Sequence, residues 1–268
     1  MKNMFKIISI LGVSSSLLLS NQGLEVFKAK CQSCHTPFIP IEKLVENFME
    51  EDNKLLNLKA PTLNQISYRL KQQIGNPKGD EDIHRMEVEA FISDYLINPS
   101  SNKSLCKEDV LKFFKTMPSM KGKITSDEIE AVSEYIYDYE TNLIKEKSIS
   151  YQSFDSAIDK AKKEDKIIII KASSKYCHYC KKMDREILID KDVVDALNKN
   201  FISVSIDVSK NDLPLELKTT MTPTFFFIDK NKKLIKEVAG AWDKEDFLLI
   251  LKEIRELNQK RGKRWENF

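Results

Sequence analysis

The sequence of 268 residues is poor in the residues that build nucleotide and nucleic-acid sites. It has only 7 glycines, and none of them forms the G-x-G-x-x-G or phosphate-cradling loop of nucleotide-cofactor sites. Its six arginines leave few side chains for bidentate phosphate recognition, and a net charge of +2 provides no broad basic surface. The sequence therefore predicts no nucleotide cofactor and no nucleic-acid partner.

Long apolar runs that approach the length of a membrane span are equally scarce, and the one candidate lies at the start of the chain. Lys2 and Lys6 lead into an apolar stretch over residues 7–19, which at about 13 residues is short for a membrane span and typical of a signal peptide. Ser20 suits the last position before a cut, but Leu18 is larger than the residue expected two places earlier. We expect a signal peptide over residues 1–20 and export to the periplasm, an oxidising compartment. An uncleaved N-terminal anchor is the alternative and would be the protein's only link to a membrane.

The rest of the chain divides into two halves with different apolar periodicity. Up to residue 147, apolar residues recur every three or four positions, and Thr125-x-x-Glu128 is a capping box that predicts the start of a helix. The second half contains four strand-like segments, at residues 166–170, 201–208, 224–228 and 234–238. Helical patterns lie before the first strand, over residues 177–189, and after Asp243. The sequence predicts two domains, all-α over residues 21–147 and α/β over residues 148–268.

Five cysteines and three histidines carry most of the chemical information. Cys31-Gln-Ser-Cys34-His35 has the C-x-x-C-H spacing of a c-type haem attachment site. Two thiols about one helical turn apart can add to the two vinyl groups of one haem, while the adjacent imidazole reaches the iron. The alternatives are a plain dithiol or half a zinc site, and the latter needs further ligands from Cys106, His84 or the second cysteine pair.

The first helix carries a family resemblance. Gly23-x-x-x-Phe27-x-x-x-Cys31-x-x-Cys34-His35 resembles the N-terminal helix and haem site of the class I, mono-haem cytochromes c. The resemblance implies one covalent haem c, bound through Cys31, Cys34 and His35. It also implies that Gly23 and Phe27 pack against an aromatic residue of the last helix of the domain, for which Tyr135 is the counterpart.

The same resemblance implies a methionine as the second axial ligand of the iron. Thr116-Met117-Pro118 stands shortly before the last helix and matches the family's position for this ligand, with Met120 as the rival. A thioether ligand favours ferrous iron and raises the potential. The resemblance covers the two ends of residues 22–145, and Ala60-Pro61-Thr62-Leu63 follows no family pattern that can be assigned.

The second cysteine pair lies where a redox pair is expected. Cys177-His-Tyr-Cys180 follows a predicted buried strand and begins a helix. Free amide groups and the dipole at a helix N-terminus stabilise the Cys177 thiolate, and Lys175 and a protonated His178 add positive charge. Cys180, one turn further on, is placed to resolve a mixed disulfide formed at Cys177.

With Met221-Thr222-Pro223-Thr224 ahead of a strand, residues 150–258 resemble the thioredoxin superfamily, most closely its exported thioredoxin-related members. The resemblance implies that Pro223 is cis and faces the cysteine pair, where an extended substrate binds. The chain departs from thioredoxin at Lys171, which replaces a buried proton-accepting aspartate, and at His178-Tyr179, which replaces Gly-Pro. Cations near Cys177 predict a pair poised towards an oxidant. A structural disulfide on a binding domain is the alternative.

Two residues lie outside these motifs. Cys106 is the odd cysteine, and we expect it to be buried and inert, with a mixed disulfide or a dimer contact as the alternative. His84 stands in the polar stretch 80–89, and we expect its side chain to be solvated.

Together the motifs predict an exported thiol–disulfide oxidoreductase that also carries a haem electron-transfer domain. Its expected partners are redox proteins for the haem and thiol or disulfide substrate proteins for Cys177 and Cys180. Haem passes one electron at a time and a dithiol two, so we expect the two domains to serve one process without direct transfer between them. The alternative is an electron carrier whose thioredoxin-like domain only docks it to a partner.

Overall fold

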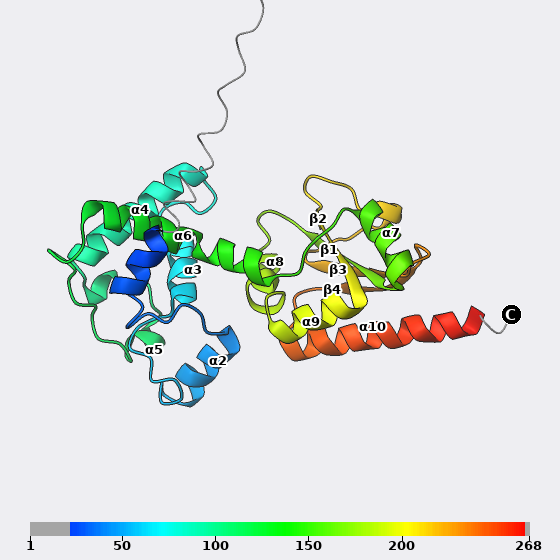
Figure 1. Cartoon of the computed structure of the whole chain (residues 1–268), viewed down its shortest axis with the longest axis horizontal. Coiled ribbons are helices and arrows are strands. Elements are labelled where there is room, and N and C mark those ends of the chain that lie inside the picture. The colour runs from blue at the N-terminus through cyan, green and yellow to red at the C-terminus, as the bar shows by residue number, and fades with distance from the viewer. Residues whose placement is uncertain (1–21, 266–268) are drawn as a thin grey trace, which may run out of the picture. The chain divides into compact units, whose positions relative to one another are not determined.

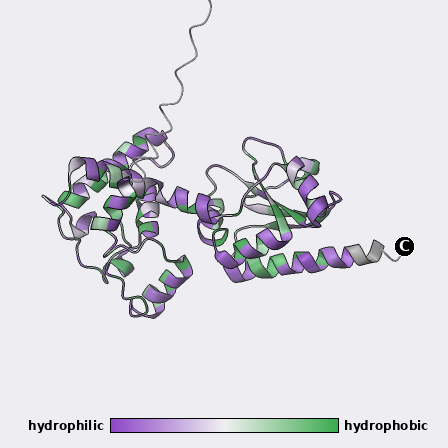
Figure 2. Ribbon diagram, in the orientation of Figure 1, coloured by the Kyte–Doolittle hydropathy of each residue, from purple (hydrophilic) through white to green (hydrophobic). Residues whose placement is uncertain are grey.

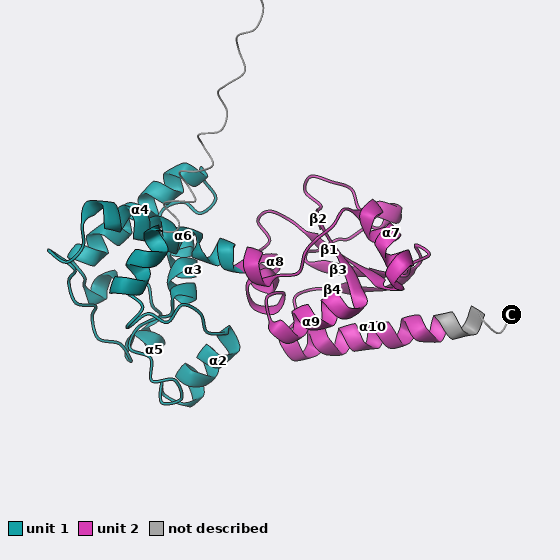
Figure 3. Ribbon diagram, viewed as in Figure 1, with its two compact units in different colours: residues 1–143 teal, residues 144–268 magenta. Residues whose placement is uncertain are grey.

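The protein is described by a computed structural model over residues 22–265 (Figure 1). The chain divides into two compact units, residues 1–143 and 144–268 (Figure 3). The division falls near the end of helix α6 (Ser126–Lys147), close to the boundary predicted after residue 147. The predicted signal peptide lies outside the described residues. Within residues 22–265, no helix is both long and apolar enough to cross a membrane.

Among the described residues of the first unit, every regular element is a helix or helical turn, as predicted. Its elements are a helix over residues 22–30, α2 (Ile41–Val45), the π-helix η1 (Glu46–Glu50), α3 (Leu63–Gln73), α4 (Glu81–Ile97), the 3-10 turn η2 (Ser101–Lys103), α5 (Glu108–Leu111) and α6. The predicted capping box forms at the start of α6, where the Glu128 amide donates to Thr125 Oγ1 at 3.3 Å and the Thr125 amide donates to Glu128 Oε2 at 2.9 Å.

The first helix packs closely against α6. A Cβ atom on Gly23 would lie 2.2 Å from the carbonyl oxygen of Ala131 and 2.6 Å from Cβ of Tyr135, so only glycine fits there. One turn further along, the rings of Phe27 and Tyr135 have centroids 5.7 Å apart. This contact confirms the predicted packing of Gly23 and Phe27 against Tyr135.

The expectation for His84 was wrong. His84 is buried, and its Nδ1 lies 2.9 Å from the hydroxyl of Tyr137 while its Nε2 lies 3.1 Å from the carbonyl oxygen of Ile74. A carbonyl can only accept, so Nε2 carries the proton and Nδ1 accepts from the tyrosine hydroxyl. Both ring nitrogens thus have hydrogen-bond partners, which is why the core can hold this side chain.

The second unit is an α/β fold built on one four-stranded sheet (Figure 1). Its strands are β1 (Ile167–Ser173), β2 (Phe201–Asp207), β3 (Thr224–Ile228) and β4 (Leu234–Ala239). Its helices are α7 (Phe154–Glu164), α8 (His178–Lys182), the π-helix η3 (Met183–Ile187), α9 (Lys191–Asn200), the 3-10 turn η4 (Pro214–Glu216) and α10 (Lys244–Trp265). The strand order is β2-β1-β3-β4, with β1 parallel to β2 and β3 antiparallel to both β1 and β4. This arrangement confirms the predicted β-α-β unit followed by a hairpin and a helix.

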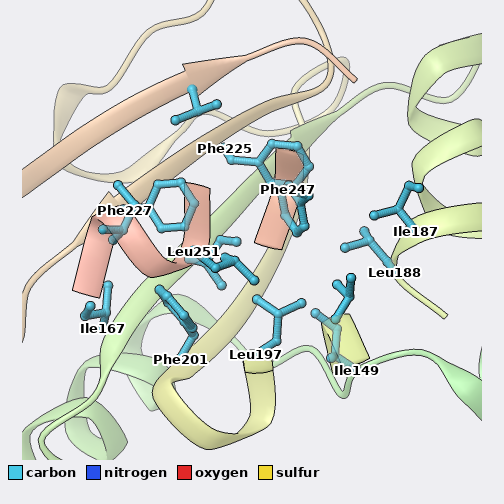
Figure 4. Close-up of a cluster of buried hydrophobic side chains, with 14 of the residues drawn as sticks. Ile149, Ile167, Ile187, Leu188, Leu197, Phe201, Phe225, Phe227, Phe247 and Leu251 are labelled. Carbon is cyan, nitrogen blue, oxygen red and sulfur yellow. The ribbon is translucent and has the colours of Figure 1, made fainter. Parts of the chain in front are cut away.

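Both faces of the sheet are covered, as the apolar run in β1 predicts (Figure 2). On one face, Ile167 and Ile169 of β1 contact apolar residues of η3, α9 and α10 (Figure 4). On the other face, Ile168 and Ile170 pack against α7. The helix predicted over residues 177–189 is divided into α8 and η3.

Candidate functional site

The second cysteine pair lies at the start of α8, immediately after β1. Cys177 is the N-cap residue of α8, its amide donates to the Ser174 carbonyl at 3.1 Å, and its Sγ accepts from the Cys180 amide at 3.0 Å. Cys177 and Cys180 form a disulfide, with their Cα atoms 5.2 Å apart. The structure thus places the pair on the strand-to-helix turn predicted from the sequence.

The two cysteines differ in their access to solvent. Cys180 is 3% exposed, whereas Cys177 is half-buried and stands in sequence between Tyr176 and Tyr179, each of which is 59% exposed. Cys177 is therefore the more accessible cysteine of the pair. In an exchange reaction, this difference makes Cys177 the attacking residue and Cys180 the resolving one.

Pro223 lies beside this turn. The Thr222–Pro223 peptide bond is cis, as predicted, and the Pro223 carbonyl accepts from the Gly240 amide at 2.8 Å. Ser174 Oγ lies 3.5 Å from Thr222 Oγ1, so the loop that ends in Pro223 meets the segment that leads to Cys177. Strand β3 starts directly after Pro223 and pairs with β1, which holds the two segments in register.

Lys171, which stands where thioredoxin has a buried aspartate, forms an ion pair with an aspartate. Lys171 is 4% exposed and its ammonium group forms an ion pair with the carboxylate of Asp184 in η3. Lys171 shares the face of β1 that carries Ile167 and Ile169, so the pair lies on the side of the sheet covered by η3. Sequence reasoning missed Asp184, although its position four residues after Cys180 places it on the same side of the helix.

The first cysteine pair and His35 lie on a turn that continues the first helix. The amide of Cys31 donates to the Phe27 carbonyl, and the amides of Cys34 and His35 donate to the Cys31 carbonyl at 3.1 and 2.9 Å. Cys31 and Cys34 are both free thiols, and Cys34 is exposed. Burial raises the pKa of the Cys31 thiol to about 11.

His35 is oriented by a backbone group that sequence reasoning missed. Its Nδ1 lies 2.8 Å from the carbonyl oxygen of Pro61, just before α3. Because the carbonyl only accepts, Nδ1 carries the proton, and the lone pair of Nε2 is available for a metal ion. Burial lowers the pKa of the imidazole, which favours this neutral form. No sequence signal ties Pro61 to His35, because 26 residues separate them.

The remaining candidate ligands lie between α4 and α6. Met117 and Met120 are both half-buried in the segment between α5 and α6, where the Met120 amide donates to the Leu96 carbonyl at 2.8 Å. Cys106 is half-buried, and burial raises the pKa of its thiol. Within residues 22–265, no three His, Cys, Asp or Glu side chains are grouped to hold a metal ion. The described residues therefore offer no complete zinc site around Cys31 and Cys34.

Comparison with known proteins assigns the second unit. Residues 154–255 match the family described as a thioredoxin-like domain. An uncharacterized protein of Aquifex aeolicus is 29% identical over 131 residues, which are 48% of this chain and 80% of that protein. A structure described as DsbH oxidoreductase is 21% identical and covers 41% of this chain and 86% of its own, with a TM-score of 0.35. A thioredoxin from Thermus thermophilus is 24% identical over 40% of this chain and 87% of its own, with a TM-score of 0.36. The family match shows that residues 154–255 form a thioredoxin-like domain, and this range includes Cys177 and Cys180.

Proposed function

We propose that the protein is a thiol–disulfide oxidoreductase that acts on partner proteins through Cys177 and Cys180. The observation that supports this most directly is the partly exposed Cys177 at the start of α8, in the same site as a buried Cys180 and the cis Pro223 loop. The free amide groups of the first turn and the helix dipole favour the thiolate form of Cys177. The amide of Cys180 already points at the Cys177 sulfur, at 3.0 Å.

The exchange proceeds in two steps that need no further reactant. In the first step, the Cys177 thiolate attacks a disulfide of the partner, forms a mixed disulfide and releases one partner thiolate. In the second step, the Cys180 thiolate attacks the Cys177 sulfur and releases the other partner thiolate. The partner disulfide gains two electrons and the Cys177–Cys180 pair becomes the disulfide seen in the structure. The reverse sequence oxidises a partner dithiol.

We further propose that the first unit binds one c-type haem, as a class I cytochrome c domain. The residues fit such a group: Cys31 and Cys34 are free thiols on one turn, and His35 presents an unprotonated Nε2 because Pro61 holds its Nδ1 proton. The two thiols would hold the haem covalently, and His35 and Met117 would be its axial ligands, with Met120 as the rival to Met117. A bound haem would exchange single electrons with redox partner proteins.

The proposed location is the periplasm. Residues 1–20 have the pattern of a signal peptide, and haem of this type is attached outside the cytoplasm. The same oxidising location suits a thiol–disulfide exchange domain.

The thiol activity is tested by equilibrating the full chain with mixtures of reduced and oxidised glutathione. We expect Cys177 and Cys180 to be oxidised together in one two-electron transition, because their sulfurs are bonded in the structure. A Cys177→Ala variant is the matched control and should show no such transition. A pair that stays oxidised even in strongly reducing buffer would identify a structural disulfide instead.

The haem proposal is tested by producing the chain in an exporting host that attaches c-type haem. We expect haem that remains bound after denaturation in the natural sequence and is lost in a Cys31→Ala/Cys34→Ala variant. In Met117→Ala the haem should stay covalently bound while its spectrum reports the loss of a sulfur ligand, and Met120→Ala is the matched control. Absence of covalent haem in a correctly exported, folded chain would contradict the proposal.

A further inference from the structure

A cavity of about 240 Å3 opens next to the exchange site. It is lined by Ser174, Val208, Ser209 and the four residues 219–222. Ser174 precedes Cys177 by one turn, and Thr222 directly precedes the cis Pro223. The cavity thus borders both segments that a partner must touch when its cysteine reaches Cys177.

The lining of this cavity is neutral and rich in hydroxyl groups. Five of its residues are serine or threonine, and none is charged, although 31% of the chain consists of charged residues. A charged side chain would find no counter-ion among the lining residues themselves. Neutral amide and hydroxyl side chains, by contrast, can exchange hydrogen bonds with water for hydrogen bonds with these hydroxyl groups.

The loop that forms one wall is held rigidly. The carbonyl oxygen of Met221 accepts from Thr219 Oγ1 at 2.7 Å and from Thr224 Oγ1 at 2.9 Å, and Thr224 is fully buried. The peptide N–H and C=O of Thr222 make no hydrogen bond to any residue that the structure describes. A preformed wall with an open peptide group suits the backbone of an extended segment.

Exposed apolar side chains occur both in the lining of the cavity and next to Cys177. Met221 lines it and is 52% exposed, and Tyr176 and Tyr179 stand exposed beside Cys177. Aromatic and methionine side chains favour contact with partner proteins because they bury much surface at little cost in conformational freedom. The surroundings of Cys177 thus combine exposed aromatic rings with the basic side chains of Lys175 and His178, whereas the residues that line the cavity are polar but uncharged.

We propose that this cavity is a subsite for one neutral polar side chain of the partner, a serine, threonine, asparagine or glutamine within two residues of its reactive cysteine. The limit of two residues follows because Ser174 lies one turn from Cys177 and an extended chain rises about 3.3 Å per residue. This inference rests on the proposed exchange at Cys177 and adds a selection among its partners.

The test uses the full chain with Cys180→Ser, which stops the reaction at the mixed disulfide. Each probe is a short peptide with a single cysteine, activated as a mixed disulfide with thionitrobenzoate. The Cys177 thiolate attacks the peptide sulfur, and thionitrobenzoate leaves as the coloured thiolate, so one disulfide forms and one breaks. Asn, Thr, Asp or Lys is placed in turn at each of the two positions on either side of the cysteine. The same chain with Cys177→Ala gives the reaction of the other cysteines, which is subtracted.

Rates are divided by the rate of the same variant with hydroxyethyl disulfide, which has no side chain to place in the cavity. At one position we expect Asn or Thr to react about tenfold faster than Asp or Lys. Thr220→Phe, which fills the cavity from an exposed position, and Thr220→Val, which removes one hydroxyl, should reduce this preference. Asn211→Phe adds the same bulk at an exposed residue outside the lining and should leave the preference unchanged.

Equal rates for all peptides, together with normal exchange with hydroxyethyl disulfide, would overturn the subsite and leave the proposed function intact. A preference for Asp would also overturn it, since nearby lysines and not the cavity would then select the partner. A preference that survives both Thr220 substitutions would place the selection elsewhere. No reaction of Cys177 with any disulfide would instead refute the proposed function.

Discussion

Gly23 shows how the absence of one side chain sets the distance between two helices. Its missing Cβ lets the first helix approach the backbone of α6 at Ala131, and this approach brings Phe27 onto Tyr135. The turn with Cys31, Cys34 and His35 follows directly on this helix. The close packing that Gly23 permits therefore fixes the position of the helix that leads to the proposed haem ligands.

Replacing Gly23 with alanine should destabilise the first unit by about 3 kcal/mol, because the new Cβ meets a backbone oxygen that cannot move independently. Gly122→Ala is the control: its Cβ meets nothing within 4 Å, and only its positive φ of 75° costs about 1 kcal/mol. Urea unfolding followed by circular dichroism measures both. Equal effects of the two substitutions would contradict the close packing at Gly23.

At the scale of elements, three segments meet at the exchange site. Strand β1 leads to Cys177, helix α8 begins there, and the loop before β3 brings Thr222 to Ser174. Beneath them, the ion pair of Lys171 and Asp184 joins the sheet to the π-helical turn after α8. A buried ion pair is costly to break, because removing one partner leaves the other charge without compensation.

We expect Asp184→Ala to lower the free energy of unfolding of the second unit by about 2–3 kcal/mol, since the buried Lys171 then loses its partly exposed partner. The double variant Lys171→Met/Asp184→Leu removes both charges and should recover most of this loss. Asp195→Ala, which removes the exposed pair with Lys191, is the control and should change stability by less than about 1 kcal/mol. Tryptophan fluorescence follows the second unit, since Trp242 and Trp265 both belong to it. Equal effects of Asp184→Ala and Asp195→Ala would contradict a buried pair.

A second ion pair joins the end of the first helix to the start of α6. Lys30 Nζ donates to Glu128 Oε2 at 2.7 Å and to the Lys123 carbonyl at 2.6 Å. The hydrogen bond from Lys30 is the main reason why the pKa of Glu128 lies below its ordinary value. Because the pKa of Glu128 is lower in the folded protein, its pair with Lys30 stabilises the fold at pH values above the ordinary carboxyl pKa. This stabilisation is lost as the pH falls through the folded pKa.

Lys30→Met should therefore raise the pKa of Glu128, measured by NMR titration, and lower stability at neutral pH. The stability difference between the natural chain and the variant should shrink as the pH falls from neutral to below the folded pKa of Glu128, because the protonated carboxyl no longer carries the charge that pairs with Lys30. Lys28→Met, which removes only the exposed contact with Glu25, is the control. A difference that is the same at both pH values would show that Lys30 acts through packing alone.

Local patterns predicted most of these elements. Strand β3 begins and ends at the predicted residues, and the capping box at Thr125 forms as expected, because neighbours along the chain determine both. His84 was misjudged because its burial depends on Tyr137, 53 residues away. The Pro61 carbonyl and the Asp184 carboxylate were missed for the same reason: their partners, His35 and Lys171, come from other elements.

At the scale of the whole chain, the apolar core of the second unit is built from residues of that unit alone. The two apolar clusters on either side of the sheet use only residues from Ile149 to Leu257. The cysteine pair and the cis Pro223 lie within the same range. The second half therefore contains everything that its core and its exchange site require.

We expect a fragment of residues 148–268 to fold alone and to keep the exchange reaction with hydroxyethyl disulfide. Its tryptophan-fluorescence unfolding curve in urea should overlie that of the full chain, because both report the same cores. A fragment carrying Phe225→Ala, which empties the centre of one cluster, is the control and should unfold at lower urea. An unfolded natural fragment would show that the first half is needed for the fold of the second.

The most direct test of the account is to trap the partners of Cys177. The full chain with Cys180→Ser is expressed in the cells that make the protein, free thiols are blocked, and proteins linked to it by a disulfide are identified by mass spectrometry. We expect a defined set of linked proteins that is absent when Cys177→Ala is added. If no protein is linked although Cys177 reacts freely with a small alkylating reagent, the thioredoxin-like domain is not an exchange enzyme, and the protein would be an electron carrier that uses this domain for docking.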